Sequence, residues 1–337
     1  MNTNSNFGTS LLKLNGFAKA ALVLGVLLSL ALSQPTPAKG QTPRPSGVLT
    51  FSDGTDFFDY DIKTRGLTPY GKGGNPYRAE NGYALVEDFN HDLVLVSPDG
   101  RRRTTVVSEG MSDNLSRGNF ILSPDAKTVI YDRPSNDPQF DYLLVVHDVQ
   151  SGKDKQHGYA RVDHVTPQDW MPDGGLLAMP FGQQKTVEKG EIVPLNFFII
   201  YKDFIGKDYF FVDQPGTKPV DKISNLRMEP TRKGPSGVRI GGKRIAFTWD
   251  THVWIASYHG DGAKQITESD GVAVGEDYPA WSPDGNWLAV RHSEGALTEI
   301  DLVPVDGMTH SMSDNGVIRL LDKKGSGFYS HGRITWR

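Results

Sequence analysis

The stretch that most constrains the fold is residues 277–290, which contain Trp281-Ser282-Pro283-Asp284-Gly285 and end on an apolar run. Pro, Asp and Gly in succession favour a tight turn, and the apolar residues on either side favour two short β-strands. Weaker copies of this pattern occur at residues 78–86, 122–131, 170–179 and 228–247. The copies follow one another at intervals of roughly 44 to 58 residues, a spacing typical of the blades of a β-propeller.

The rest of the chain agrees with an all-β fold. Glycine (37 residues) and proline (21 residues) are frequent, as expected for many turns. Continuous apolar runs such as residues 143–146 and 197–200 are short and fit strands that are covered on both faces. We therefore predict a six-bladed β-propeller over residues 48–337. Blades two to six are expected to begin near Asn75, Asn119, His164, Ile223 and Tyr278.

The two ends of this region predict how the ring closes. Residues 48–52 and 57–62 form two expected strands, but no inner strand precedes them as in the later copies. Residues 333–336 place Trp336 where Trp281 stands in its own copy. The C-terminal strand is thus expected to complete the N-terminal blade, which leaves the ring without an open edge.

The copy in residues 279–290, followed by a strand and the turn Asp306-Gly307, resembles the repeat of the TolB-like six-bladed β-propellers, a WD40-like repeat called PD40. The resemblance covers roughly residues 48–337 and implies the propeller fold. TolB carries an α/β domain before its propeller. In its place this chain is expected to have only a leader and a linker.

The first 33 residues predict export. They contain no acidic residue, their only charges are Lys13 and Lys19, and an apolar run follows from Ala20 to Leu32. This pattern is typical of a secretory signal peptide, here cleaved before Gln34; an uncleaved N-terminal anchor is the alternative. Residues 34–47 contain four prolines and are expected to form a stiff linker. The mature chain is therefore predicted to be periplasmic or secreted, with no membrane span after cleavage.

Composition and motifs exclude several classes of function. The net charge of −4 gives no electrostatic basis for binding nucleic acid. With no cysteine, the chain can contain neither disulfides nor a lipoprotein attachment site. The sequence has no Walker loop for nucleotide phosphates and no His-Glu-x-x-His zinc motif. Residues 88–92 suit a polar hairpin turn better than a calcium-binding loop. We predict a monomer with no cofactor and no metal.

Superposing the repeats brings out one set of positions, three residues before Trp281 and its equivalents. In a closed ring these positions should converge near one mouth of the central channel. They are occupied by Asn75, Asn119, Pro167, Asn225, Tyr278 and Arg333. The next polar layer holds Arg117, His164, Ser224, Glu276, Asp277 and His331. Asparagine at a strand entrance can simply cap a turn; the alternative is a mouth that binds a ligand or a peptide.

Two hypotheses about function follow. The first is a non-catalytic propeller that binds a protein or peptide partner at the channel mouth, through Asn75, Asn119, Asn225, Tyr278, Arg333 and Arg117, and through insertions near residues 183–193 and 229–242. The alternative is a carbohydrate-active lyase or hydrolase, with Asp169, His164, Glu276, Asp277 and His331 as catalytic candidates. Trp170, Trp281 and Trp336 are expected to pack between blades, and Asp173 and Asp284 to form turns.

Overall fold

The computed structural model describes most of the region predicted to be the propeller. The described residues are 42–108, 120–139, 142–159, 165–180, 184–185, 192–193, 197–201, 207–211, 223–233, 239–269, 274–294, 297–321, 325, 327–328 and 330–337. The predicted signal peptide, most of the linker, and the candidate residues Asn119, Arg117 and His164 lie outside them. In the described part, no helix has the length and apolar character needed to cross a membrane.

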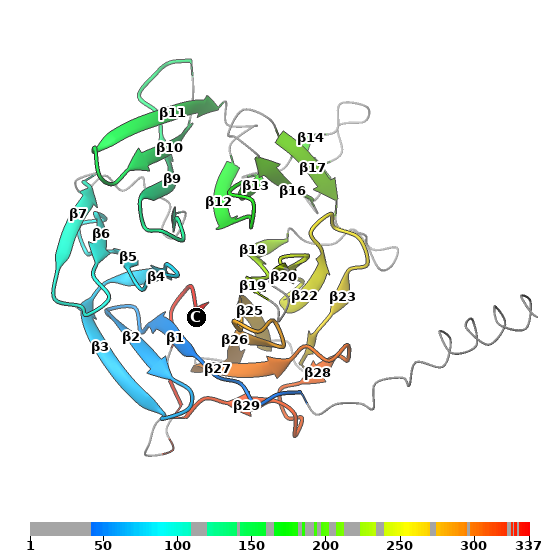
Figure 1. Ribbon diagram of the computed structural model, residues 1–337. Coiled ribbons are helices and arrows are strands. Elements are labelled where there is room, and N and C mark those ends of the chain that lie inside the picture. The colour runs from blue at the N-terminus through cyan, green and yellow to red at the C-terminus, as the bar shows by residue number, and fades with distance from the viewer. Residues whose placement is uncertain are drawn as a thin grey trace, which may run out of the picture. The chain divides into compact units, whose positions relative to one another are not determined.

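Six four-stranded antiparallel sheets are arranged around a central channel (Figure 1). From the inner strand outwards, blades one to three are β30 (Thr335–Trp336), β1 (Val48–Ser52), β2 (Asp56–Asp61) and β3 (Gly66–Lys72); β4 (Gly74–Arg78), β5 (Ala84–Glu87), β6 (Leu93–Val96) and β7 (Arg103–Val107); and β8 (Phe120–Leu122), β9 (Thr128–Pro134), β10 (Tyr142–Asp148) and β11 (Lys153–Tyr159). Blades four to six are β12 (Val165–Trp170), β13 (Leu176–Pro180), β16 (Phe197–Tyr201) and β17 (Lys207–Phe211); β18 (Ser224–Met228), β21 (Arg244–Trp249), β22 (His252–Ser257) and β23 (Lys264–Gln265); and β25 (Val274–Trp281), β26 (Trp287–Glu294), β27 (Leu297–Pro304) and β29 (Ile318–Arg319). The predicted six-bladed propeller is confirmed.

The ring closes as the sequence predicts. Strand β30 pairs antiparallel with β1, with Leu49 opposite Trp336 and Thr50 opposite Thr335. The amide of Val48 donates to the carbonyl of Arg337 at 2.8 Å, and the amide of Arg337 donates back to Val48 at 3.1 Å. The first blade therefore contains both ends of the propeller sequence.

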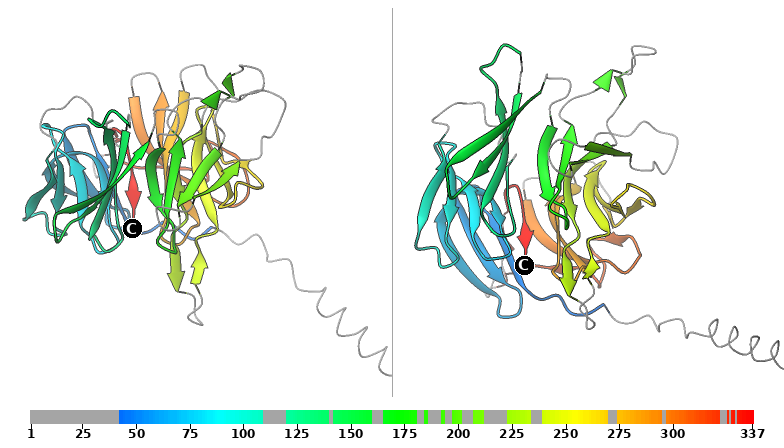
Figure 2. Two further views of the ribbon diagram at one scale, coloured as in Figure 1. Left: turned by 90° about the horizontal axis from the view of Figure 1, so that it is seen from above. Right: turned by 45° about the horizontal axis from the view of Figure 1, so that its top comes forward.

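Three further strand pairs lie outside the blades. Two are hairpins inserted in blades four and five, as expected from the two polar insertions, and the third joins blades five and six. They are β14 (Gln184–Lys185) with β15 (Ile192–Val193), β19 (Thr231–Lys233) with β20 (Arg239–Gly241), and the parallel pair β24 (Thr267–Glu268) with β28 (His310–Ser311). The β19–β20 hairpin projects from the face of the ring at which β30 ends (Figure 2).

In blades three and six, a Ser-Pro-Asp motif forms the turn after the inner strand. In blade six, the hydroxyl of Ser282 donates to Asp284 Oδ1 at 2.6 Å and accepts the amide of Trp287 at 2.9 Å. Blade three repeats this geometry, with Ser123 donating to Asp125 at 2.7 Å. Asp284 is therefore a turn former, as expected, because its carboxylate organises the backbone.

The apolar core lies between adjacent blades. One cluster spans blades two to four, and others join blade four to five, five to six, and six to one. Trp281 is buried, and its indole donates to the carbonyl of Arg227 in the neighbouring blade at 3.1 Å. Trp170 and Trp336 are half-buried against these clusters. The predicted packing role of the three tryptophans is confirmed.

The last residues of the predicted linker lie against blades six and one. The indole of Trp287 donates to the carbonyl of Pro43 at 2.6 Å, and the indole of Trp336 donates to the carbonyl of Ser46 at 2.9 Å. The described end of the linker is thus held by the propeller through backbone carbonyls.

Candidate functional site

The channel has two distinct ends. We call the end at which the inner strands begin the entry mouth; Gly74, Ser224 and Gly275 lie there. We call the end at which they finish the exit mouth; Arg78 and Met228 lie there. The positions that the superposed repeats bring together belong to the entry side.

The superposed asparagines mark a bulge in the inner strands. The pairing of β4, β18 and β25 with the next strand shifts register at this position. Asn75, Asn225 and Tyr278 have φ angles of 46°, 55° and 49°, in the left-handed region that asparagine tolerates better than most residues. The asparagine side chains also make long hydrogen bonds within their own blades, Asn75 to Glu87 and Asn225 to Thr248. Backbone geometry therefore accounts for asparagine at these positions.

Arg333 lies inside the channel and not at its rim. Only 4% of its surface is exposed. Its guanidinium stacks on the rings of Tyr77 at 5.1 Å and Phe120 at 5.4 Å, and donates to the carbonyl of Phe120 at 2.5 Å. Burial lowers the pKa of Arg333 to about 9, and repulsion from Arg227 adds to the lowering. Arg333 thus fastens the closing segment to blades two and three.

Asp169 joins three blades across the channel. The hydroxyl of Tyr77 donates to Asp169 Oδ1 at 2.5 Å, and the amide of Met228 donates to Oδ2 at 2.8 Å. Burial raises the pKa of Tyr77 well above its usual value, and the charge of Asp169 raises it further. Arg227 is also buried here and donates to the carbonyl of Gln168 at 2.9 Å. These contacts give Asp169 a structural role between blades two, four and five.

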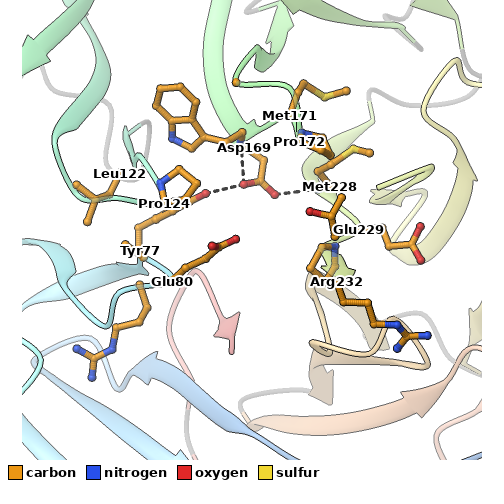
Figure 3. A pocket seen from close by; sticks show the side chains of 16 residues that line it. Tyr77, Glu80, Leu122, Pro124, Asp169, Met171, Pro172, Met228, Glu229 and Arg232 are labelled. Atoms are coloured by element: carbon orange, nitrogen blue, oxygen red, sulfur yellow. Dashed lines mark hydrogen bonds between the residues drawn. The ribbon is translucent and has the colours of Figure 1, made fainter. Parts of the chain in front are cut away.

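A pocket of about 490 Å³ opens at the exit mouth (Figure 3). Its lining comes from four blades and the base of the β19–β20 hairpin. The apolar part of the lining includes Leu122, Pro124, Met171, Pro172, Met228 and Pro230. The ionisable part is Arg78, Glu80, Asp169, Glu229 and Arg232, with the hydroxyl of Tyr77. A mixed apolar and charged concavity of this size can bind a small molecule or a side chain of a partner.

Smaller pockets lie on the entry side. One, of about 350 Å³, is lined by Asn225, Glu276 and Asp277 among others. Another, of about 240 Å³, is lined by Asn75 and His331, with His91 and the exposed ring of Phe89. Tyr278 lies beside the first, where the guanidinium of Arg291 stacks on its ring at 4.5 Å and forms an ion pair with Asp277. Burial raises the pKa of Asp277.

Glu276 is the centre of a buried cluster between blades five and six. It is fully buried and is bonded by Nδ1 of His252 at 2.9 Å, Nδ1 of His292 at 3.2 Å and the hydroxyl of Thr267 at 3.0 Å. Burial alone would raise the pKa of Glu276, but these hydrogen bonds outweigh it and lower the pKa to about 2. The hydrogen bonds to Glu276 in turn raise the pKa of both histidines.

This cluster predicts a stability optimum in mildly acidic solution. The contribution of Glu276 is present above its ordinary pKa of 4.5 and is lost as the pH falls toward 2. The contribution of the histidines is present below their ordinary pKa of 6.5 and is lost as the pH rises through their raised folded values. We therefore expect the free energy of unfolding to fall between pH ~5.5 and ~8.5 in urea titrations.

The matched variant for this prediction is Glu276→Gln, because glutamine keeps the shape of the side chain and removes the charge that raises the two histidine pKa values. Its unfolding free energy should fall less over the same pH range than that of the parent protein. Equal slopes for the two proteins would show that the cluster does not cause the pH dependence.

The catalytic candidates are not brought together. Asp169 lines the exit pocket, whereas Glu276 and Asp277 line an entry pocket and His331 lines another. Each of the three carboxylates is held by hydrogen bonds within the protein. Among the described residues, no group of three or more His, Asp or Glu side chains is placed to hold a metal ion.

Sequence reasoning missed the exit pocket. Glu80, Met171 and Arg232 each follow an inner strand, and no local motif distinguishes them from ordinary turn residues. His252 and His292 were also missed, since both are 16 or more residues away from Glu276 in sequence. The ring arrangement of the repeats is the one signal that could have brought the exit residues together.

No family model matches the sequence, and no curated protein matches it. Among solved structures, TolB from Acinetobacter baumannii matches with 14% identity and a TM-score of 0.54, over 95% of this chain and 72% of that one. A candidate TolB from Agrobacterium tumefaciens matches with 14% identity and a TM-score of 0.50, over 87% of this chain and 99% of that one. An oligogalacturonate lyase from Vibrio parahaemolyticus matches with 10% identity and a TM-score of 0.42, over 74% of this chain and 83% of that one. This likeness is too weak to bear on activity. By fold, the chain is a TolB-like β-propeller.

Proposed function

We propose that the protein is exported and acts as a non-catalytic β-propeller that binds a protein or peptide partner. The partner engages the exit mouth of the channel and the β19–β20 hairpin beside it. The proposal of export rests on the signal-peptide pattern of residues 1–33. The mature chain is expected to act as a periplasmic or secreted monomer.

The observation that carries this proposal is the exit pocket itself. Four blades contribute to its wall, and it combines methionine, proline and leucine side chains with charged groups at its edge. Methionine and proline surfaces adapt to the irregular shape of a peptide, and polar groups at the edge fix its orientation. The hairpin base adds Thr231 and Arg232 to the same wall, which extends the available surface.

The alternative, a carbohydrate-active lyase or hydrolase, has less support. A hydrolase of this kind needs two carboxyl groups flanking one scissile bond. The carboxylates proposed for that role, Asp169 on one side and Glu276 or Asp277 on the other, line different pockets. The first proposal therefore accounts for more of the site.

A pair of matched variants tests the proposed function. Pro124→Trp places a large side chain at the exit pocket from an exposed turn, and Asn90→Trp makes the same change in an exposed turn on the entry side. A partner captured from envelope extract by the parent and by Asn90→Trp, and lost from Pro124→Trp, is the expected result. Loss of the partner from Asn90→Trp alone would indicate that the partner binds at the entry mouth. If the parent protein captured no specific partner, the proposed binding role would be contradicted.

A further inference from the structure

Two carboxylates point into the exit pocket from different blades, that of Glu80 from blade two and that of Asp169 from blade four (Figure 3). Glu80 is exposed, and within the described part of the chain it forms neither an ion pair nor a hydrogen bond. Asp169 accepts hydrogen bonds from Tyr77 and from the amide of Met228. Glu80 is therefore a negative charge of the lining that is available to a ligand.

The two cations in the lining, Arg78 and Arg232, bond to other groups of the protein, and Arg232 points away from the centre of the pocket (Figure 3). The guanidinium of Arg78 is buried, forms an ion pair with Asp59 and donates to the carbonyl of Gly82 at 2.9 Å. Arg232 donates to the carbonyl of Asp284. Neither is placed to neutralise Glu80.

The remaining charges nearby are also accounted for. Glu229, the third carboxylate of the lining, is paired with Arg244 at 2.6 Å and accepts the amide of Lys243 at 3.2 Å. Arg333 and Arg227 are buried in the channel, where the charge of Arg333 interacts with those of Arg227 and Asp169. They offset the charge of Asp169, so Glu80 is the carboxylate of the lining that is open to a cation of a ligand.

The walls between these charges are apolar and suit an aliphatic chain. Met171 and Met228 are buried, Pro172 and Pro230 are half-buried, and all four line the same pocket. Lysine and arginine place several methylene groups against apolar surface while their charged end stays near polar groups. A site with an apolar wall and an unpaired carboxylate is complementary to such a side chain.

We propose that the exit mouth takes a lysine or arginine side chain presented by the partner, with the aliphatic stem against the methionines and prolines and the cation beside Glu80. This inference rests on the proposed function, because it names the chemistry by which the same site recognises its partner. It makes Glu80 the residue that determines specificity at the mouth.

The test uses a random dodecapeptide library displayed on phage and the full mature chain as bait. Peptides that bind the parent and fail to bind Pro124→Trp are exit-mouth binders, and we expect them to share a lysine or arginine. For such a peptide, Glu80→Gln should weaken binding about threefold to fivefold, as expected for one partly exposed ion pair. Changing the shared basic residue of the peptide to methionine should abolish this difference between parent and variant.

The outcomes separate the inference from the function on which it rests. Exit-mouth peptides with no shared basic residue, or with the same affinity for Glu80→Gln, overturn the inference and leave a partner-binding mouth intact. A library that yields no exit-mouth peptide overturns both. Selection with Glu80→Lys provides a further check, since it should replace the basic residue of the recovered peptides by an acidic one.

Discussion

Deletion of residues 332–337 should lower the melting temperature by about 10 °C or more. The deletion removes β30 and the backbone bonds between Val48 and Arg337, and exposes the edge of β1. It also removes Arg333, whose guanidinium stacks on Tyr77 and Phe120 in the channel. Thermal unfolding followed by circular dichroism measures the effect.

A synthetic peptide of the deleted sequence provides the control for this experiment. Added to the truncated protein, it should recover part of the lost melting temperature by pairing with β1, whereas a scrambled peptide of the same composition should not. A truncated protein that melts with the parent would show that the C-terminal strand does not hold the ring closed.

Asp169→Ala is expected to lower the free energy of unfolding by about 2 to 4 kcal/mol. The substitution leaves the buried hydroxyl of Tyr77 and the amide of Met228 without their acceptor. It also removes a carboxylate whose charge interacts favourably with the buried guanidinium of Arg333. Urea denaturation measures the change, provided that the slope of the transition is unchanged.

Asp169→Asn separates the two contributions, because an amide oxygen still accepts a hydrogen bond but carries no charge. Its stability should lie between those of the parent and Asp169→Ala. If Asp169→Ala unfolded like the parent and abolished turnover of a glycan, Asp169 would be a catalytic acid or base and not an element of the channel.

The ring could be predicted because its determinants are local and repeated. Each Ser-Pro-Asp turn is formed by its own side chains, as Ser282 and Asp284 show. Closure could be predicted too, since Trp336 repeats the place of Trp281. Repetition alone therefore led to the architecture, with no need for contacts distant in sequence.

The site could be predicted only in part, because it depends on where side chains meet across blades. The sequence alone cannot distinguish an asparagine that binds a ligand from one that adopts a left-handed backbone conformation. At positions 75 and 225 the positive φ angle explains why asparagine is present. Arg333 was expected at the mouth, but the bulk of Tyr77 and Phe120 encloses it in the channel. The exit pocket joins residues from four blades, among them turn residues of the repeat such as Pro124 and Pro172, and the repeat does not show which of its turns form a pocket together.

The central claim, that a partner binds the exit mouth, is tested most directly by site-specific photo-crosslinking in the producing cell. A photoreactive residue replaces exposed Arg232 at the exit pocket in one protein and exposed Asn90 on the entry side in another. Our account predicts a discrete crosslinked protein from position 232 and none from position 90. A crosslink from position 90 alone, or from neither position, would contradict it.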